Sequence, residues 1–533
     1  MSAEATYIVI GAGSAGCALA GRLSEDPDAS VVLFEAGKRN DSLLVRWPAG
    51  FARLQNARNR WEWETTAQAH CGGRHVPTPQ GKLVGGGSAV NGMVYIRGNP
   101  RDYDGWADAG ATGWGYRDVL PFFRKAEDNM RFADDWHGTG GPLGVSDQIS
   151  PSPLTRLFVL AGQETGHRHN PDFNGAHQAG VGFYQVTQRA GQRCSSAHAY
   201  LYPVLDRPNL RLETRVQVTR VLIEHGRAVG IEYLRDGATR PERLMAQREV
   251  ILSAGAINSA KLLMLSGIGP ADDLSALGID PVHHLPGVGH NLHDHVDAYV
   301  CVRINAPISY TGQERGLAAI RHGLEYLLFK SGAVTSNACE GGLFASSDGN
   351  EDWPDIQLHF MPVMLPSHQM IDGHGVTVLC SALRPRSRGQ LRLASADPRR
   401  DPLIDTNFLA DPDDLRVNIA ALRVGRAVMN APSFRKLHGG EVFPGTDLVS
   451  DTDLGNYVRA FAKTDYHPVG TCRMGTDPMA VVDPALRVHG MDGLRVADAS
   501  IMPAIVSGNT NAPSIMIGER AAQFVRDNAP ATP

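Results

Sequence analysis

The sequence has no run of about 18 consecutive apolar residues, so it offers no candidate for a membrane-spanning helix. It also has no basic excess: 51 Lys and Arg stand against 56 Asp and Glu, and the net charge of −5 argues against a nucleic-acid partner. Seven scattered cysteines without a C-x-x-C pair indicate reduced thiols rather than a disulfide framework. The absence of a G-x-S-x-G motif disfavours a serine hydrolase.

The overall composition is typical of a globular protein. Of the 533 residues, 42% are apolar and 20% are charged, which is enough to bury several cores. The residues before the first glycine lack a basic segment, so we expect no signal peptide. These features predict a cytoplasmic enzyme without a transmembrane segment, and they leave peripheral contact with a membrane surface open.

The first 35 residues carry a dinucleotide-binding pattern. Tyr7–Ile10 is typical of a buried parallel strand, and it leads directly into the G-x-G-x-x-G motif at Gly11–Gly16. A helix is expected from Ala15 to Leu23 and a second strand over Ser30–Phe34. Glu35 follows Gly16 by 19 residues, the spacing expected of a carboxylate that binds ribose. This order of elements predicts a site for NAD or FAD and does not separate the two.

A second glycine-rich segment, Gln80–Met93, contains three consecutive glycines before Ser88. Glycines remove side chains where backbone must approach a flat or anionic group. Apolar residues flank the segment, at Leu83-Val84 and over Met93–Ile96, and a solvated loop would not need them.

At these motifs the sequence resembles the glucose–methanol–choline (GMC) oxidoreductases, a family of flavoprotein alcohol oxidases and dehydrogenases. The resemblance covers nearly the whole chain. Further matching segments are Gly255–Gly269, Val288–His295, His467–Thr471, Val496–Ser500 and Gly508–Pro513. The resemblance implies FAD rather than NAD.

The resemblance also implies how FAD is held. Some relatives attach FAD covalently through a histidine just before the asparagine that matches Asn91; Val90 stands at that position here, which implies non-covalent FAD. The strand at Gln217–Thr219 is similar to the one that holds adenine, and the segment at Asp498 to the one that lies against the ribityl chain and pyrophosphate. The residues expected to bind the cofactor are Gly11, Gly13, Ser14, Ala15, Gly16, Glu35, Ala36, Val84, Gly86, Gly87, Asn91, Gly92, Val94, Val218, Asp498, Ala499 and Asn511.

Two residues are expected to carry the chemistry. Oxidation of an alcohol removes the hydroxyl proton while hydride leaves carbon for flavin N5, and histidine is suited to accept that proton near neutral pH. His467 stands where the family has its catalytic base. The partner that holds the substrate oxygen falls on Asn509, with Asn511 as the competing choice, because an amide can donate to that oxygen without titrating.

A metal site is not expected. His290, His293 and His295 lie close together in sequence with Asp294, but they fall in a segment to which the family gives no metal.

The expected fold is α/β, or α+β overall: a Rossmann-like FAD-binding domain interleaved with a substrate-binding domain on an antiparallel sheet, the GMC arrangement. The cofactor domain is predicted from residues 1–151, 207–299 and 455–533, and the substrate domain from residues 152–206 and 300–454. Period-two runs at 356–360 and 389–393 predict strands of that sheet with one covered face.

The predicted reaction is oxidation of an alcohol, a primary alcohol or polyol, to an aldehyde or ketone. The spacing of motifs is most similar to that of choline-dehydrogenase-like and sorbose-dehydrogenase-like bacterial members. A quaternary ammonium substrate would need an aromatic cage and a carboxylate. The residues that could supply them, without any spacing that singles them out, are Trp61, Trp63, Tyr310, Glu340 and Trp353.

The electron acceptor is predicted to be a quinone or another acceptor rather than oxygen. Asp465 and Tyr466 stand just before His467, and a polar residue and a bulky ring there favour a dehydrogenase. Three alternatives stay open: an alcohol oxidase that uses O2, a hydroxynitrile lyase of the same family with non-redox FAD, and a non-catalytic flavoprotein.

Overall fold

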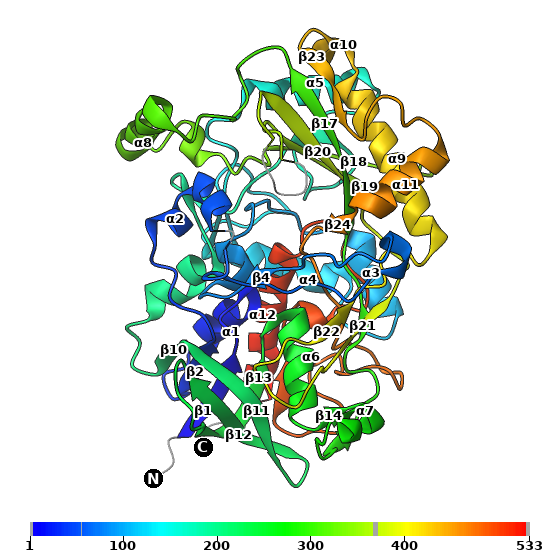
Figure 1. The fold of residues 1–533 in the computed structure, drawn as a ribbon. Helices are drawn as coiled ribbons and strands as arrows, with labels where there is room; N and C mark the ends of the chain where they lie inside the picture. Colours follow the sequence, from blue (N-terminus) through cyan, green and yellow to red (C-terminus); the bar gives the residue numbers. More distant parts are fainter. Residues whose placement is uncertain (1–3, 55, 366–370, 529–533) are drawn as a thin grey trace.

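Two seven-stranded sheets lie toward the two ends of the molecule (Figure 1). The computed structural model describes residues 4–54, 56–365 and 371–528. In spatial order the strands of the first sheet are β10 (Leu210–Thr214), β2 (Val31–Glu35), β1 (Glu4–Ile10), β13 (Glu242–Leu252), β12 (Arg227–Arg235) and β11 (Val216–Glu224), with β25 (Leu494–Val496) beside β13. Strands β10, β2, β1, β13 and β25 are parallel, so their carboxyl ends meet at one edge, where α/β sheets bind ligands.

Helices cover both sheets. Those of six residues or more are α1 (Ser14–Leu23), α3 (Pro100–Asp108), α4 (Tyr116–Ala126), α5 (Pro153–Glu164), α6 (Gly255–Leu265), α7 (Ala271–Ala276), α8 (Gly316–Phe329), α9 (Pro412–Met429), α11 (Asp451–Phe461) and α12 (Asn511–Asp527). The short ones are α2 (Leu43–Arg46) and α10 (Pro432–Arg435). Among the described residues, no helix combines the length and the apolar character needed to cross a membrane.

The turn between β1 and α1 depends on two glycines. Gly11 has φ +102°, a conformation that residues with a side chain rarely adopt. A Cβ atom on Gly16 would lie 1.9 Å from the carbonyl oxygen of Gly11. The G-x-G-x-x-G motif therefore lets α1 pack closely against β1 and β2, with the first turn of the helix at the carboxyl edge of the sheet.

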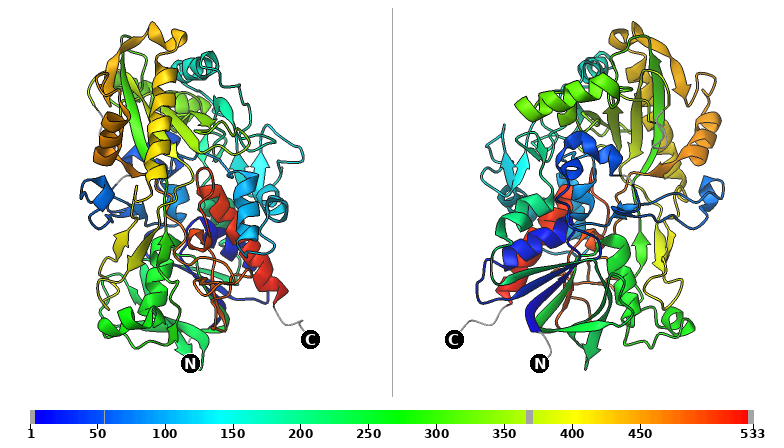
Figure 2. Two further views of the ribbon diagram at one scale, coloured as in Figure 1. Left: turned by 90° about the vertical axis from the view of Figure 1, so that its right-hand side faces the viewer. Right: turned by 60° about the vertical axis from the view of Figure 1, so that its left-hand side comes forward.

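The second sheet is antiparallel, as predicted. In spatial order its strands are β23 (His438–Phe443), β17 (Val296–Ile304), β20 (Gly375–Ala382), β19 (Ile356–Met361), β18 (Gly341–Ala345) and β7 (Gly180–Phe183), with β24 (Lys463–Thr464) beside β17. A separate apolar core packs against it, and α5 and α9 supply much of that core. Figure 2 shows this sheet and its helices at the end opposite the first sheet.

Two parts of the strand prediction are wrong. The sheet does not have one covered face: β18 and β19 are buried along their whole length. Helices α5 and α9 pack on one side, while on the other side β19 lines the cavity with His359 and Met361, and Phe344 of β18 joins a small apolar cluster. The run at 389–393 does not join this sheet. It forms β21 (Gly389–Arg392), which pairs with β16 (His290–Leu292) and β22 (Leu403–Asp405) in a small sheet of its own.

The remaining two-stranded ladders are local. They pair β3 (Arg60–Trp61) with β4 (Gln80–Gly81), β5 (Glu127–Asn129) with β6 (Leu143–Val145), β8 (Gln188–Arg189) with β9 (Gln192–Arg193), and β14 (Ile268–Gly269) with β15 (His283–His284).

The predicted domain ranges stay a prediction. Strands of the first sheet come from the start, the middle and the end of the chain. β17 crosses the boundary predicted at 299/300, and β24 pairs with the second sheet although it lies within the range 455–533. The outermost residues of the ranges, 1–3 and 529–533, lie outside the described residues.

Candidate active site

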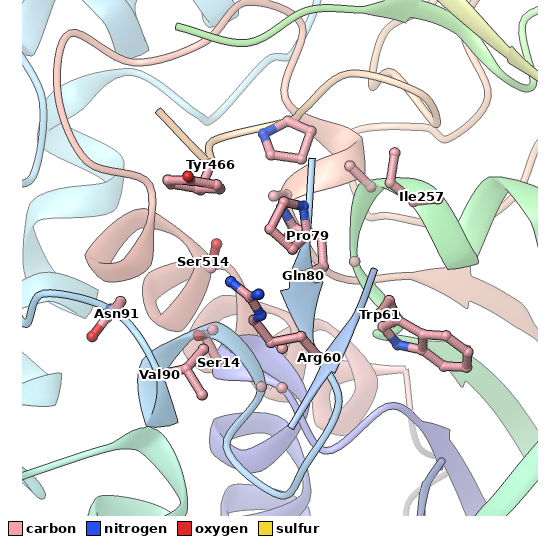
Figure 3. Close-up of a pocket in the computed structure, with 18 of the residues that line it drawn as sticks. Ser14, Arg60, Trp61, Pro79, Gln80, Val90, Asn91, Ile257, Tyr466 and Ser514 are labelled. Carbon is pink, nitrogen blue, oxygen red and sulfur yellow. The ribbon is translucent and has the colours of Figure 1, made fainter. Parts of the chain in front are cut away.

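A cavity of about 770 Å³ runs between the two sheets. Its lining begins at the carboxyl ends of β1 and β2 and extends past the second glycine-rich segment to His467 and Asn509. Figure 3 shows Ser14 and Val90 on one side of this cavity and Tyr466 on the other. A cavity of this volume is typical of a ligand site.

The cavity gathers all but two of the residues expected to bind the cofactor or to carry the chemistry. Those on its lining are Gly11, Gly13, Ser14, Ala15, Glu35, Ala36, Gly86, Gly87, Asn91, Gly92, Val94, Val218, His467, Asp498, Ala499, Asn509 and Asn511. Gly16 and Val84 do not line it. Gly16 faces the backbone of the preceding turn, and Val84 lies in the core of the first sheet with its N–H donated to the Lys38 carbonyl.

The end of the cavity at the first sheet fits a dinucleotide. No side chain caps the first turn of α1, so its N–H groups are available to an anion. Gly87 and Gly92 leave open space where a Cβ atom would lie. The Glu35 carboxylate accepts hydrogen bonds from the N–H groups of Gly37, at 2.7 Å, and Ala12, at 3.1 Å, while burial raises its pKa. This combination suits a pyrophosphate and a ribose.

At the other end, two antiparallel segments bring His295 and His467 together. β24 pairs with the start of β17, and His293 forms an isolated bridge with Val469. Asp294 links the segments: its carboxylate accepts the N–H of His467 at 2.9 Å and the hydroxyl of Thr464. Burial raises the pKa of Asp294 to about 7, against the two hydrogen bonds that lower it.

The hydrogen bonds around His467 define its tautomer. Nε2 of His295 lies 2.9 Å from the Leu383 carbonyl, which only accepts, so this nitrogen carries the proton. Nδ1 of His295 is then an acceptor, and it lies 3.0 Å from Nδ1 of His467. The proton of His467 is therefore on Nδ1, and its Nε2 is an unprotonated acceptor on the cavity side.

The amide of Asn509 agrees with this assignment. Its Nδ2 lies 3.3 Å from Nε2 of His467, and an amide nitrogen only donates. Asn511 has a different partner, since its Oδ1 accepts the hydroxyl proton of Ser14 at 2.8 Å. Nε2 of His467 and Nδ2 of Asn509 thus form a pair of acceptor and donor that a hydroxyl group can bridge.

A buried charge pair lies beside His467. Oδ2 of Asp465 is 3.5 Å from Nδ1 of His467 and 3.5 Å from Nε2 of His359. Burial raises the pKa of Asp465, but the neighbouring histidines overcome it, and the net pKa is well below its usual range. Tyr466, between Asp465 and His467, has φ +65°, and this turn of the backbone lets both side chains reach the same place.

Burial lowers the pKa of His467, and the cations of His359 and Lys463 lower it further, while Asp465 raises it. Burial and His467 lower the pKa of His295 to about 3, so His295 stays neutral. Burial also disfavours the charged form of His359, but Cys339 and Asp465 outweigh this and hold its pKa well above the usual value. The site thus pairs a neutral His467 with a buried Asp465–His359 ion pair.

His295, His359 and Asp465 lie around His467, and the sequence predicted a role only for Asp465, as a polar residue that favours a dehydrogenase. Alternation along β19 could have indicated His359, because His359 and Met361 line the cavity while Leu358 and Phe360 join the apolar core. Asp294 and His295 lie in the segment Val288–His295, from which the sequence predicted family membership and no metal but no contact with His467.

The predicted absence of a metal stays a prediction. By distance alone, His295, Asp465 and His467 could hold an ion, since their ligand atoms lie within 4.8 Å of one another. Within the described ranges, His290 and His293 join no such group. His293 is occupied by the carbonyl of Asn291 and the N–H of Ile505.

The aromatic residues considered for an ammonium cage do not gather around His467. Trp61 and Trp63 line the cavity, but Nζ of Lys82 already lies 3.9 Å from the ring centroid of Trp61. Tyr310 donates its hydroxyl to Glu340 at 2.6 Å, and neither residue is on the cavity lining. Trp353 stacks under Arg384, also away from the cavity.

Comparison with known proteins gives consistent matches. Family models described as GMC oxidoreductase match residues 5–297 and 385–518. An alcohol dehydrogenase [acceptor] of Pseudomonas putida is 46% identical over 527 residues, which cover 97% of this chain and 95% of that protein. An oxygen-dependent choline dehydrogenase of Brucella anthropi is 41% identical over 99% of this chain and 96% of its own length. The crystal structure of pyridoxine 4-oxidase from Mesorbium loti has a TM-score of 0.90 at 31% identity and covers 99% of this chain and 100% of its own.

Proposed function

The chain belongs to the GMC oxidoreductase family, and from that premise we propose that it is an alcohol dehydrogenase with His467 as its base and Asn509 as the donor to the substrate oxygen. It is an FAD-dependent enzyme that oxidises alcohols. The observation that carries the assignment of roles is the unprotonated Nε2 of His467, which faces the cavity beside the amide of Asn509.

Bound FAD supplies the acceptor for the hydride that leaves the alcohol carbon. Nε2 of His467 accepts the hydroxyl proton, and the resulting imidazolium is stabilised by Asp465, 3.5 Å from Nδ1. Nδ2 of Asn509 donates to the oxygen as negative charge develops on it. Nδ1 of neutral His295 accepts a hydrogen bond from Nδ1–H of His467 throughout, which keeps Nε2 of His467 directed at the substrate.

For the cofactor, we propose that the first turn of α1 and Gly86–Gly87 hold the pyrophosphate, Glu35 the ribose, and Val218 the adenine. Asn91, Gly92 and Val94 are assigned to the flavin end. Val90 has no nucleophilic atom, which supports non-covalent binding. Gly16 supports the site indirectly, through the turn that it allows.

Replacing Gly16 with Ala is expected to abolish FAD retention. The new Cβ would lie 1.9 Å from the Gly11 carbonyl oxygen, so α1 has to move away from the turn. The measurement is the ratio of flavin to protein absorbance after purification. Gly105→Ala is the matched control, because Gly105 is also helical and has nothing within 4 Å of an added Cβ. Full FAD content in G16A would contradict the prediction.

We propose that the reduced enzyme passes its electrons to a quinone or another acceptor other than oxygen. The relative named as an alcohol dehydrogenase [acceptor] supports this, although a second relative is named as oxygen-dependent. The buried charges of Asp465 and His359 and the ring of Tyr466 crowd the space next to His467.

For the substrate, we propose a neutral primary alcohol or polyol. The carboxylates around the base already have partners: Asp465 is paired with His359, and Asp297 with Nζ of Lys463 at 2.8 Å. Asp294 accepts hydrogen bonds from the N–H of His467 and the hydroxyl of Thr464. A quaternary ammonium group would therefore find no free negative charge among these groups.

The proposal is tested by adding primary, aromatic, polyol and amino alcohols to the anaerobic FAD-loaded protein and recording the flavin absorption band. Bleaching by one class of alcohol is expected, with fast reoxidation by a quinone or dye and slow reoxidation by air. Fast reoxidation by air would indicate an oxidase instead. If no alcohol bleaches the flavin while a cyanohydrin is cleaved, the enzyme is a lyase.

Asp465→Asn is expected to lower the pKa of His467 further, since Asp465 is the charge that raises it. The base must be neutral, so the rate falls as pH drops through this pKa. The acidic limb of kcat/KM should therefore move to lower pH, and the rate on the plateau should fall about tenfold because the imidazolium loses its counter-charge. Asp28→Asn, at an exposed aspartate, should leave the profile unchanged. A limb that moves to higher pH would contradict the argument.

A further inference from the structure

Helix α8 exposes large apolar side chains to solvent along one face. The spacing of three and four residues places them on the same side of the helix. They are Leu317, Ile320, Leu324, Leu327, Leu328 and, at the end of the helix, Phe329. Exposure reaches 85% for Leu317 and 74% for Phe329. Single exposed apolar residues are common on proteins, but a continuous row of them marks a contact surface.

The opposite face of α8 is fixed to the body of the protein. Tyr326 is buried, its ring packs against Trp47 with 5.6 Å between centroids, and its hydroxyl donates to the Gly191 carbonyl at 3.1 Å. Figure 1 shows α8 at the periphery of the molecule, next to α2. The exposed row is therefore the outer side of an anchored helix rather than a core face without its partner.

Basic residues surround this row. Arg321 is exposed in the middle of the helix, and Arg315 and Lys330 flank its two ends. Arg46, exposed on α2, is close enough to Tyr326 to lower its pKa, against the burial that raises it. The acidic residues are Glu314, paired with Arg315 at 2.9 Å, and Glu325. An apolar face with basic neighbours is complementary to an anionic lipid surface.

A second copy of the chain fits this face less well. In a twofold dimer the row would pack against itself, and residues near the middle of the helix would meet their own copies. Arg321 lies at that midpoint, so two guanidinium groups would be buried against each other. On a bilayer the same side chain extends to the phosphates while the leucines enter the acyl boundary.

We propose that the exposed face of α8 docks the protein on a membrane surface that contains anionic lipid. The helix lies in the interface and does not cross it, in keeping with its 14 residues. The purpose of this docking rests on the proposed function, because a dehydrogenase docked there could reduce a quinone dissolved in the bilayer. The docking itself rests on the exposed face of α8 and the basic residues around it.

The test is flotation of the FAD-loaded protein with vesicles of phosphatidylcholine, with and without about one phosphatidylglycerol in three lipids. The wild type should float with the anionic vesicles and less with the neutral ones. The double variant Leu317→Glu/Leu324→Glu should lower partitioning by about tenfold or more. Arg321→Gln should weaken binding only to the anionic vesicles. Val449→Glu, at a valine outside α8 that is 67% exposed, should bind as the wild type does.

Both variants of α8 should reduce a water-soluble dye at the wild-type rate, which reports folding and separates docking from catalysis. If the wild type oxidises no alcohol but still floats, the proposed function fails and the docking stands. Absence of flotation, or flotation that the double variant retains, would overturn the docking. A dimer that Leu324→Glu dissociates in sedimentation, without vesicle binding, would assign the face to a second copy.

Discussion

His467→Ala is expected to slow reduction of the flavin by alcohol about 10²–10⁴-fold, the range for loss of a general base. Nε2 of His467 is the neutral nitrogen that faces the cavity, and no other neutral imidazole nitrogen in this cluster is free. His295 does not line the cavity, and His359 is held in its charged form by Asp465 and Cys339. Neither can replace the missing base. Rapid mixing with the alcohol under anaerobic conditions measures the step directly.

The same variant should lose the acidic limb of the pH profile. Burial lowers the pKa of His467 below its ordinary value of 6.5, so the wild-type rate should fall only at pH values below that. His467→Gln keeps much of the volume and hydrogen bonding but has no basic nitrogen, and it should be as slow as His467→Ala. His290→Gln controls for the loss of a histidine from the neighbouring segment, because His290 does not line the cavity. Wild-type flavin reduction in both His467 variants would refute the assignment.

The cofactor end of the cavity could be predicted in detail because its geometry is local. Strand, turn, helix and strand follow one another within 35 residues, and Gly11, Glu35 and their neighbours meet through contacts that short spacings determine. Gly16 and Val84, the two expected cofactor residues that do not line the cavity, are also placed by local contacts. Gly16 lies against the backbone of the turn and Val84 in the core of the first sheet, so neither is on the cavity surface.

The catalytic end could be predicted only in part, because long-range pairing creates it. His295 and His467 are far apart in the sequence and meet because β24 pairs with β17. Alternation along β19 could indicate that His359 faces away from the apolar core, but not that this side meets His467, which depends on how the sheet packs on the rest of the chain. Tyr466 at φ +65° brings Asp465 and His467 to the same point, and no propensity predicts that conformation for a tyrosine.

His295→Leu is expected to lower the rate of flavin reduction about 10²-fold without removing any group that touches the substrate. Nδ1 of His295 is the acceptor, at 3.0 Å, that keeps the proton of His467 on Nδ1. Without it, His467 can move its proton to Nε2, where the nitrogen no longer accepts from Asn509 and cannot take up the hydroxyl proton. His295→Asn offers an oxygen near the same place and should restore most of the rate, which a merely structural role would not predict.

Asp465 allows a second test of this role, because it is the other acceptor near Nδ1 of His467, at 3.5 Å. Each acceptor can partly replace the other, so His295→Leu combined with Asp465→Asn should be slower than the product of the two single effects. Such coupling between neighbours is the quantity that a double-mutant cycle measures. Multiplicative effects would mean that His295 does not hold the proton of His467. The role of the contact between His295 and His467 would then be to fix the position of the ring rather than its tautomer.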